Sequence, residues 1–197
     1  MIRGHVGQDE LFLKSTLMTV TLISRKAALM GGIIDTGIDD DGSVSNFVET
    51  EHIIEVDRNL VSFVFVRGSV PCFWDRINDK LNDLTTPYDI EIQREFEMHE
   101  VAFKLHIKDL IESYQKVVLI NLLDSNLDYE LALIKFYEFL IKKTNEKMKK
   151  KLKYIYCNYK KELINNDIEE IMSIKTSAEV MKYFWIDEKQ KIVARQE

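Results

Sequence analysis

The chain has 197 residues, of which 46% are hydrophobic and 30% charged, and its net charge is −6. This balance is typical of one globular domain, and it excludes a disordered chain and a generally basic nucleic-acid-binding protein. The apolar runs are far shorter than the roughly 20 residues of a membrane span, and no signal-peptide pattern is visible. The two cysteines, Cys72 and Cys157, lack metal-ligand spacing, which fits a reducing compartment.

The first part of the chain carries β-strand signals. Residues 16–23 are rich in β-branched and apolar side chains and predict a strand. A glycine-containing loop is expected over residues 27–43. A hairpin should follow, with arms at Val44–Glu55 and Leu60–Val66 and a turn at Asp57-Arg58-Asn59. Pro71 closes this region, and a polar connector is expected from Asp75 to Pro87.

From residue 90 onward the apolar spacing becomes helical. Six apolar or aromatic residues predict one helical face within Ile90–Tyr114: Phe96, Phe103, Ile107, Leu110, Ile111 and Tyr114. The continuous apolar run Val117–Leu122 predicts a strand buried on both faces. The remaining elements expected are a helix from Leu127 to Ile141 with a lysine-rich end, a strand at Tyr154–Tyr156, a helix at 160–173, and a hairpin of Met181–Ile186 and Lys191–Ala194 around Asp187-Glu188. The elements predict an α/β fold, with a β-rich hairpin region followed by alternating strands and helices.

Two long strings between Gly37 and Trp74 are more specific than periodicity. The first reads Gly-Ile-Asp-Asp-Asp-Gly-Ser-Val-Ser-Asn-Phe-Val-Glu-Thr-Glu, and the second reads Ser-Phe-Val-Phe-Val-Arg-Gly-Ser-Val-Pro-Cys-Phe-Trp. In this order and at this separation they closely resemble the Sac phosphoinositide phosphatases. Weaker matches extend the resemblance from about Leu22 to Glu197: Ala102-Phe103 with His106, Tyr114–Leu123, Tyr183–Asp187 and Arg195–Glu197. The resemblance implies a single partial Sac phosphatase domain over residues 1–197 that stops just before the catalytic loop.

The resemblance also implies cysteine-based phosphatase chemistry in a Cys-x-x-x-x-x-Arg loop. In such a loop a thiolate of lowered pKa attacks phosphorus, and the arginine grips the phosphoryl oxygens. Here the sixth residue after Cys72 is Asn78, and the sixth after Cys157 is Leu163. We therefore predict that both cysteines are buried and structural, that the chain holds no catalytic residue, and that it is inactive by itself.

Two segments depart from the family pattern. Relatives carry several basic residues before the Gly-Ile-Asp turn, whereas this chain keeps Arg25 and Lys26 and then becomes apolar. The family's Phe-Asp-Phe-His string aligns with Cys157-Asn158-Tyr159-Lys160, which lacks the Asp and the His. These internal losses favour a relaxed or inactive member of the family.

Seven residues are candidates for binding a phosphorylated headgroup: Arg25, Lys26, Asn46, Glu49, Glu51, Arg67 and Ser69. Arg67 and Ser69 either offer a cation and free N–H groups or merely belong to a turn shaped by Gly68 and Pro71. Asn46, Glu49 and Glu51 are interpreted as sharing one strand face. They either order the catalytic loop by hydrogen bonding or form the wet face of a half-buried strand.

Three other features have a simple structural interpretation beside a functional one. The segment Asp39-Asp40-Asp41-Gly42 lacks the spacing of a calcium loop and is interpreted as a turn. His106 matches the family but is expected to be structural. Residues 142–153 are rich in lysine and form either a peripheral membrane contact or a solvated helix end.

The resemblance implies hydrolysis of monophosphorylated phosphatidylinositols through a phosphocysteine intermediate, with no metal ion or other cofactor. The implied partners are a phosphoinositide headgroup or an anionic membrane surface, with a protein partner as a further candidate and no nucleic acid. The implied location is cytoplasmic, peripheral to the endoplasmic reticulum or Golgi. The alternatives are a catalytically dead Sac-like scaffold that binds a partner or an anionic membrane, and an unstable fragment.

Overall fold

The computed structural model describes residues 4–13, 15–26, 36–57, 59–77, 89–158, 183–186 and 192–195. The chain divides into two compact units. The first comprises Met1–Ile33, Asn46–Gly68 and Met181–Glu197, and the second comprises Ile34–Ser45 and Ser69–Val180. The first unit is a sheet, and the second combines helices with two short strand pairs.

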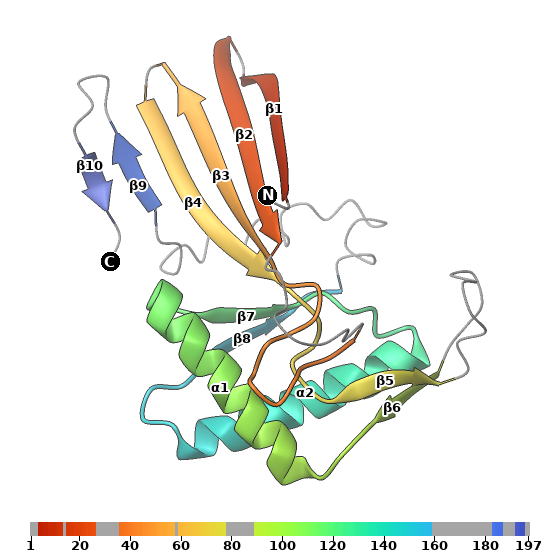
Figure 1. Cartoon of the computed structure of the whole chain (residues 1–197). Helices are drawn as coiled ribbons and strands as arrows, with labels where there is room; N and C mark the ends of the chain where they lie inside the picture. Colours follow the sequence, from red (N-terminus) through yellow and green to blue (C-terminus); the bar gives the residue numbers. More distant parts are fainter. Residues whose placement is uncertain are drawn as a thin grey trace. The chain divides into compact units, whose positions relative to one another are not determined.

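The first unit contains a six-stranded sheet in the order β1-β2-β3-β4-β9-β10, with every neighbouring pair antiparallel (Figure 1). The strands are β1 (Gly4–Leu13), β2 (Thr16–Lys26), β3 (Val48–Val56), β4 (Asn59–Arg67), β9 (Tyr183–Ile186) and β10 (Ile192–Arg195). β1 to β4 follow one another in sequence, whereas β9 joins β4 from more than a hundred residues further along the chain. The predicted strand at 16–23 and the strands of the C-terminal hairpin are confirmed.

The predicted β3–β4 hairpin is also confirmed, and its turn has a local cause. Val56 pairs with Asn59, so the loop has two residues, and Asp57 adopts the positive φ of 47° that such tight turns favour. The first arm, however, begins at Val48 rather than at Val44. Asn46 has a φ of 55°, which interrupts extended backbone, and Val44 instead bridges to Ile38.

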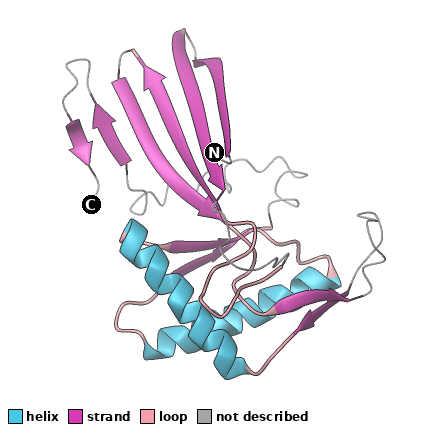
Figure 2. Ribbon diagram, in the orientation of Figure 1, coloured by secondary structure: helices cyan, strands magenta, loops and turns pink. Residues whose placement is uncertain are grey.

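The second unit is built around two helices and a parallel strand pair (Figure 2). Its elements are β5 (Trp74–Ile77), β6 (Asp89–Ile92), α1 (Phe96–Tyr114), β7 (Val118–Asn121), α2 (Asp128–Lys147) and β8 (Lys153–Tyr156). β7 and β8 pair in parallel and are joined through α2, which makes a β-α-β connection. β5 and β6 form an antiparallel ribbon.

The core of this unit lies along the facing sides of α1 and α2. Phe103 of α1 and Leu140 of α2 have no exposed surface, and Cys72 is equally buried. The other buried apolar helix residues recur at the spacing of one helical face: Ala102, Ile107, Leu110, Leu133, Ile134, Tyr137 and Ile141. Truncation of a core aromatic such as Phe103 typically costs about 3–5 kcal/mol, so this interface is a main source of stability.

Three predictions for this part of the chain need correction. Residues 90–92 belong to β6 rather than to the first helix, and Trp74–Ile77 pairs with them instead of forming a connector. The predicted strand at 117–122 is present as β7, but it is not buried on both faces, because Ile120 is 49% exposed. The predicted helix at 160–173 and the turn at Asp187-Glu188 lie outside the described residues. In the part of the chain that the structure describes, neither helix is long and apolar enough to cross a membrane.

Candidate functional site

Three of the candidate residues gather on one face of the first unit's sheet. Arg25 of β2 lies directly opposite Glu49 of β3. Its guanidinium is 3.7 Å from Glu49 Oε1 and 3.9 Å from Glu51 Oε2. The hydroxyl of Ser62 on β4 donates to Glu51 Oε1 at 2.6 Å. Sequence reasoning overlooked Ser62, although it is the only hydroxyl in the apolar strand Leu60–Val66 and is 2% exposed.

This cluster positions Arg25 rather than leaving its charge free. Two carboxylates flank one guanidinium, so the group as a whole carries a net negative charge. The Arg25 side chain is 58% exposed, and at these distances the pairs are worth at most about 1 kcal/mol each. The interpretation of Glu49 and Glu51 as residues on one face agrees with this geometry.

Lys26 and Arg67 occupy a different position in the sheet. Both pair with Val48, Lys26 from β2 and Arg67 from β4, so they stand in one register row across three strands. Because successive residues of a strand alternate between faces, this row belongs to the face opposite Arg25. Arg67 is exposed, and no acidic side chain among the described residues pairs with it. The candidate cations are therefore divided between two faces.

Asn46 does not share the face of Glu49 and Glu51. It precedes β3 by two residues, is exposed, and adopts a φ of 55°. The prediction of a common strand face for the three residues is therefore wrong for Asn46, because the left-handed backbone conformation breaks the alternation. Asparagine tolerates this conformation better than most residues, which gives Asn46 a local structural role.

Ser69 belongs to the second unit, where it holds the loop that carries the Gly-Ile-Asp string. Its hydroxyl accepts the N–H of Gly37 at 2.9 Å, and its own N–H donates to the carbonyl of Ser45 at 2.9 Å. Gly37 has a φ of 72°, and a Cβ there would lie 2.5 Å from the carbonyl oxygen of Cys72. Both groups of Ser69 are thus used within the loop, which supports its role in a turn.

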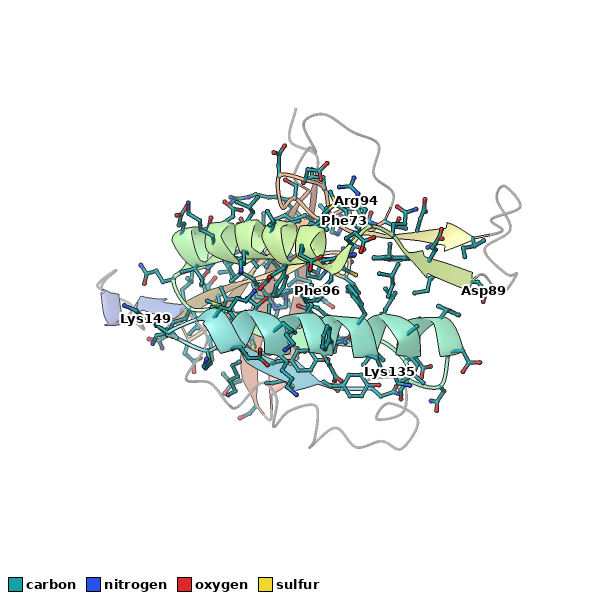
Figure 3. All side chains as sticks on the ribbon, turned by 90° about the horizontal axis from the view of Figure 1, so that it is seen from below. Phe73, Asp89, Arg94, Phe96, Lys135 and Lys149 are labelled. Carbon is teal, nitrogen blue, oxygen red and sulfur yellow. The ribbon has the colours of Figure 1, made fainter. Side chains whose placement is uncertain are left out.

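The acidic segment is a turn, as the sequence predicts. Asp39 Oδ1 accepts the N–H groups of Asp41 at 3.0 Å and Ser43 at 2.7 Å. Asp40 pairs with Arg94, whose guanidinium also lies 3.9 Å from the centre of the Phe73 ring (Figure 3). Among the described residues, no group of three or more His, Cys, Asp or Glu side chains is placed to hold a metal ion.

Two histidines connect loops of the second unit to α1. His106 Nδ1 donates to the carbonyl of Gly42 at 3.0 Å, which confirms a structural position. His99 has no exposed surface, and its Nδ1 accepts the N–H of Phe73 at 3.1 Å while its Nε2 donates to the carbonyl of Gln93 at 2.6 Å. Burial lowers the pKa of both histidines, because a charged imidazole would lose its hydration.

The two cysteines are buried, as predicted. Cys72 has no exposed surface and Cys157 is 6% exposed. Burial raises the pKa of the Cys72 thiol to about 12, so this thiol stays protonated at neutral pH. Neither cysteine has an arginine six residues later. The geometry of Cys72 is therefore that of a core residue and not of a phosphatase nucleophile.

A buried polar cluster lies where the parallel strands β7 and β8 end. Asp124 and Asn158 are 9% and 8% exposed, and Asn158 Nδ2 donates to Asp124 Oδ1 at 3.1 Å. The same oxygen accepts the backbone N–H of Asn126 at 3.0 Å and its side-chain amide at 2.9 Å. Sequence reasoning noted the missing aspartate at position 158 but did not predict the partner. The signal was available, because polar residues that follow two parallel strands meet at one edge of the sheet.

Comparison with known proteins agrees with the sequence strings. A family model described as the SacI homology domain matches residues 1–164. The chain is 39% identical over 124 residues to inositol-1,4,5-trisphosphate 5-phosphatase 1 of Schizosaccharomyces pombe, which covers 62% of this chain and 11% of that protein. It is 32% identical over 140 residues to polyphosphatidylinositol phosphatase INP53 of Saccharomyces cerevisiae, and the match covers 70% of this chain and 12% of that protein. It is 40% identical over 106 residues to synaptojanin-2 of Rattus norvegicus, and the match covers 53% of this chain and 7% of that protein.

The matched segments span only about a tenth of the length of these relatives. They nevertheless cover most of this chain, and the family match includes both strings between Gly37 and Trp74. The chain therefore belongs to the SacI homology domain family, among the Sac and synaptojanin phosphoinositide phosphatase homologues.

Proposed function

We propose that this chain is part of a Sac catalytic domain and binds the anionic headgroup of a phosphatidylinositol phosphate at one end of its large sheet. The observation that carries the proposal is the register of β2, β3 and β4. Lys26 and Arg67 both pair with Val48, so their Cα atoms stand about 10 Å apart, which is two strand spacings. A lysine and an arginine at this separation suit one phosphorylated headgroup, because both residue types are long and positively charged.

Arg67 is the residue best suited to grip the phosphate. It is exposed at the last position of β4, and its planar guanidinium matches two phosphate oxygens at once. Glu49 and Glu51 take a supporting role in this proposal. On the other face they more than neutralise the charge of Arg25, so Lys26 and Arg67 are the candidate cations that remain to attract the ligand.

Vesicle binding tests this assignment. The full chain is mixed with phosphatidylcholine vesicles that contain phosphatidylinositol 4-phosphate, and bound protein is measured by sedimentation. Hydrogen bonds to charged groups are worth about 1.5–3 kcal/mol, so Arg67→Ala should weaken binding about ten-fold or more. Lys108→Ala is the matched control, because Lys108 is an exposed cation on α1 in the other unit. Equal binding by Arg67→Ala and Lys108→Ala would refute the headgroup site.

We also propose that the chain by itself does not hydrolyse the bound lipid. The support is chemical, since a thiol of pKa about 12 without exposed surface supplies no thiolate, and Cys157 is buried as well. Phosphate release from phosphatidylinositol 4-phosphate should stay at the level of a protein-free blank while headgroup binding persists. Release that is abolished by Cys72→Ser would contradict this part of the proposal.

A second candidate is a catalytically inactive Sac-like scaffold at the cytoplasmic surface of endomembranes. It is favoured by Asn158, which stands where the family pattern has an aspartate and which is committed to Asp124 by a 3.1 Å hydrogen bond. The two candidates are distinguished by whether the protein, isolated from the cells that produce it, releases phosphate from the lipid. Phosphate release from that material supports the phosphatase, whereas lipid binding without release supports the scaffold.

A further inference from the structure

The segment at the end of α2 concentrates positive charge in an otherwise acidic chain. Residues 142–153 contain seven lysines and one glutamate, a net charge of +6, whereas the whole chain carries −6. The rest of the chain therefore carries −12. Such a separation of charge orients a molecule in an external field, and it directs this segment toward anionic partners.

Some of these lysines have local partners. Lys147 Nζ lies 2.7 Å from the carboxylate of Glu100, which joins the end of α2 to α1. This hydrogen bond is the main reason why the pKa of Glu100 is lowered. Lys143 Nζ lies 3.0 Å from Glu146 Oε2. These two lysines stabilise the fold locally and contribute little charge to a partner.

The other lysines form a surface that we call the lysine surface, consisting of Lys142, Lys149, Lys150, Lys151 and Lys153. All five are exposed, and none pairs with a carboxylate among the described residues. Lys151 Nζ donates to the backbone carbonyl of Asn145, which leaves its charge uncompensated. Lys149 lies just beyond the C-terminal end of α2 (Figure 3).

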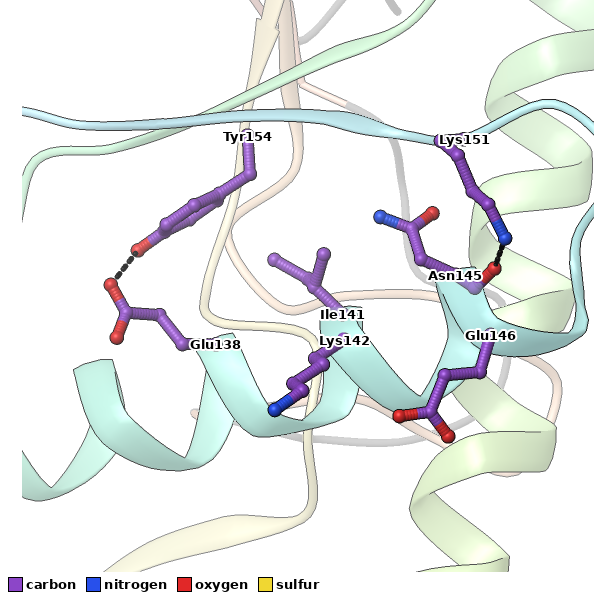
Figure 4. A pocket seen from close by; sticks show the side chains of 7 residues that line it. All are labelled: Glu138, Ile141, Lys142, Asn145, Glu146, Lys151 and Tyr154. Carbon is purple, nitrogen blue, oxygen red and sulfur yellow. Dashed lines mark hydrogen bonds between the residues drawn. The ribbon is translucent and has the colours of Figure 1, made fainter.

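A shallow pocket lies within this surface and indicates what kind of ligand suits it. Lys142 and Lys151 line the pocket, but so do Glu138 and Glu146 (Figure 4). The Tyr154 hydroxyl donates to Glu138 at 3.3 Å, and its own pKa is raised to about 12, chiefly by burial. A compact polyanion seated in this pocket would meet two carboxylates. The lysines therefore suit a spread array of negative charge better than one small ligand.

We propose that the lysine surface docks on an anionic phospholipid bilayer by charge attraction, without recognising a particular headgroup. Phe139 supports the choice of a bilayer, since it is 47% exposed and stands on α2 three residues before Lys142, a spacing that makes two residues neighbours on a helix surface. An aromatic ring at the edge of a basic surface is suited to the membrane interface. Residues 142–153 contain no arginine, the residue that nucleic-acid recognition favours.

The test compares two variants of the full chain with equal loss of charge. Lys149→Gln/Lys150→Gln removes two cations of the lysine surface, and Lys108→Gln/Lys116→Gln removes two exposed cations elsewhere in the second unit. Sedimentation uses vesicles of phosphatidylcholine and phosphatidylserine in about a four-to-one ratio, a composition that carries negative surface charge. A lysine near such a surface contributes about a five-fold increase in binding, so the first variant should bind roughly 30-fold more weakly.

Three further results separate this docking from binding at another site or to another partner. Binding of the unsubstituted chain should fall steeply with added salt and vanish on vesicles of phosphatidylcholine alone. It should survive Arg67→Ala, because the lysine surface acts independently of the proposed headgroup site. Equal losses in the two double variants would overturn the proposal. It would likewise be overturned if single-stranded RNA displaced the protein from vesicles at equal phosphate concentration, which would identify nucleic acid as the preferred partner.

Discussion

The substitution Asn158→Asp tests the buried cluster at the ends of β7 and β8. In the structure, Asn158 Nδ2 donates to Asp124 Oδ1 at 3.1 Å, and the two side chains are 8% and 9% exposed. An aspartate of the same shape would bring two carboxylates to hydrogen-bonding distance with little water between them. Two such groups cannot both be ionised at low cost, so one of them must hold a proton at neutral pH.

The size of the effect follows from the cost of that proton. Keeping an aspartyl group of ordinary pKa near 3.9 neutral at pH 7 costs at most about 4 kcal/mol. The shared proton forms a hydrogen bond that offsets part of this cost, so the expected loss in the free energy of unfolding is about 2–4 kcal/mol. At pH 7 the folded variant binds one proton more than the unfolded chain, because the pKa of one carboxyl group of the buried pair is raised. The penalty should therefore shrink as the pH is lowered toward about 4.

Urea denaturation at pH 7 and at lower pH measures this difference. Asn126→Asp is the matched control, since Asn126 donates to the same oxygen at 2.9 Å but is exposed, and its loss should stay below about 1 kcal/mol. Combining Asn158→Asp with Asp124→Asn removes the second carboxylate and should restore most of the stability. The reasoning is refuted if Asn158→Asp costs no more than Asn126→Asp, or if its penalty is independent of pH.

Three other predictions rest on local geometry. Gly42→Ala should lower the free energy of unfolding by about 1–3 kcal/mol, because Gly42 has a φ of 85° and a Cβ would lie 2.7 Å from the His106 backbone nitrogen. Urea denaturation measures this loss, and Gly7→Ala in β1 is the control, because a Cβ there would meet only the His5 side chain. The pKa values of buried His99 and His106 are lowered, so just below the ordinary histidine pKa near 6.5 the unfolded chain binds more protons than the folded chain. The urea midpoint should therefore be constant above this pH and decrease below it. A constant midpoint down to pH 5 would contradict the assignment. The pKa of Cys72 is raised from 9.0 to about 12, so iodoacetamide should label this thiol only as the protein unfolds, and rapid labelling of the folded chain would show that it is accessible.

Much of the local structure was predictable because its signals are local. The helical spacing of Phe103, Ile107 and Leu110 predicted α1, and these residues are buried where α1 faces the core. The β3–β4 hairpin followed from two β-rich arms around a short polar turn. The acidic turn and the burial of both cysteines were also predicted correctly, since each depends on residues close in sequence or on an apolar setting.

The candidate site was only partly predictable, because strand register decides which residues meet. A list of basic and acidic residues does not show that Arg25 faces two glutamates while Lys26 and Arg67 stand in the row of Val48. The φ of Asn46 removes it from the strand that its neighbours form. The Arg-Gly-Ser string left Ser69 open between a phosphate-binding residue and a turn residue, and its hydroxyl accepts the N–H of Gly37 within the turn.

The sequence by itself determined the family, the α/β class, both described helices and most of the strands, but not β1, β5 or β6. Family strings and apolar periodicity are carried by neighbouring residues, which is why they could be read from the sequence. Only the tertiary structure decided that β9 pairs with β4, that β5 pairs with β6, and that Asp124 holds Asn158 in a buried pair. These contacts join residues that are far apart along the chain, and no local propensity specifies such a partner. The physical reason is that the packing of the whole unit determines which strands pair and which polar groups are buried. Each buried polar group then needs a hydrogen-bond partner within that unit.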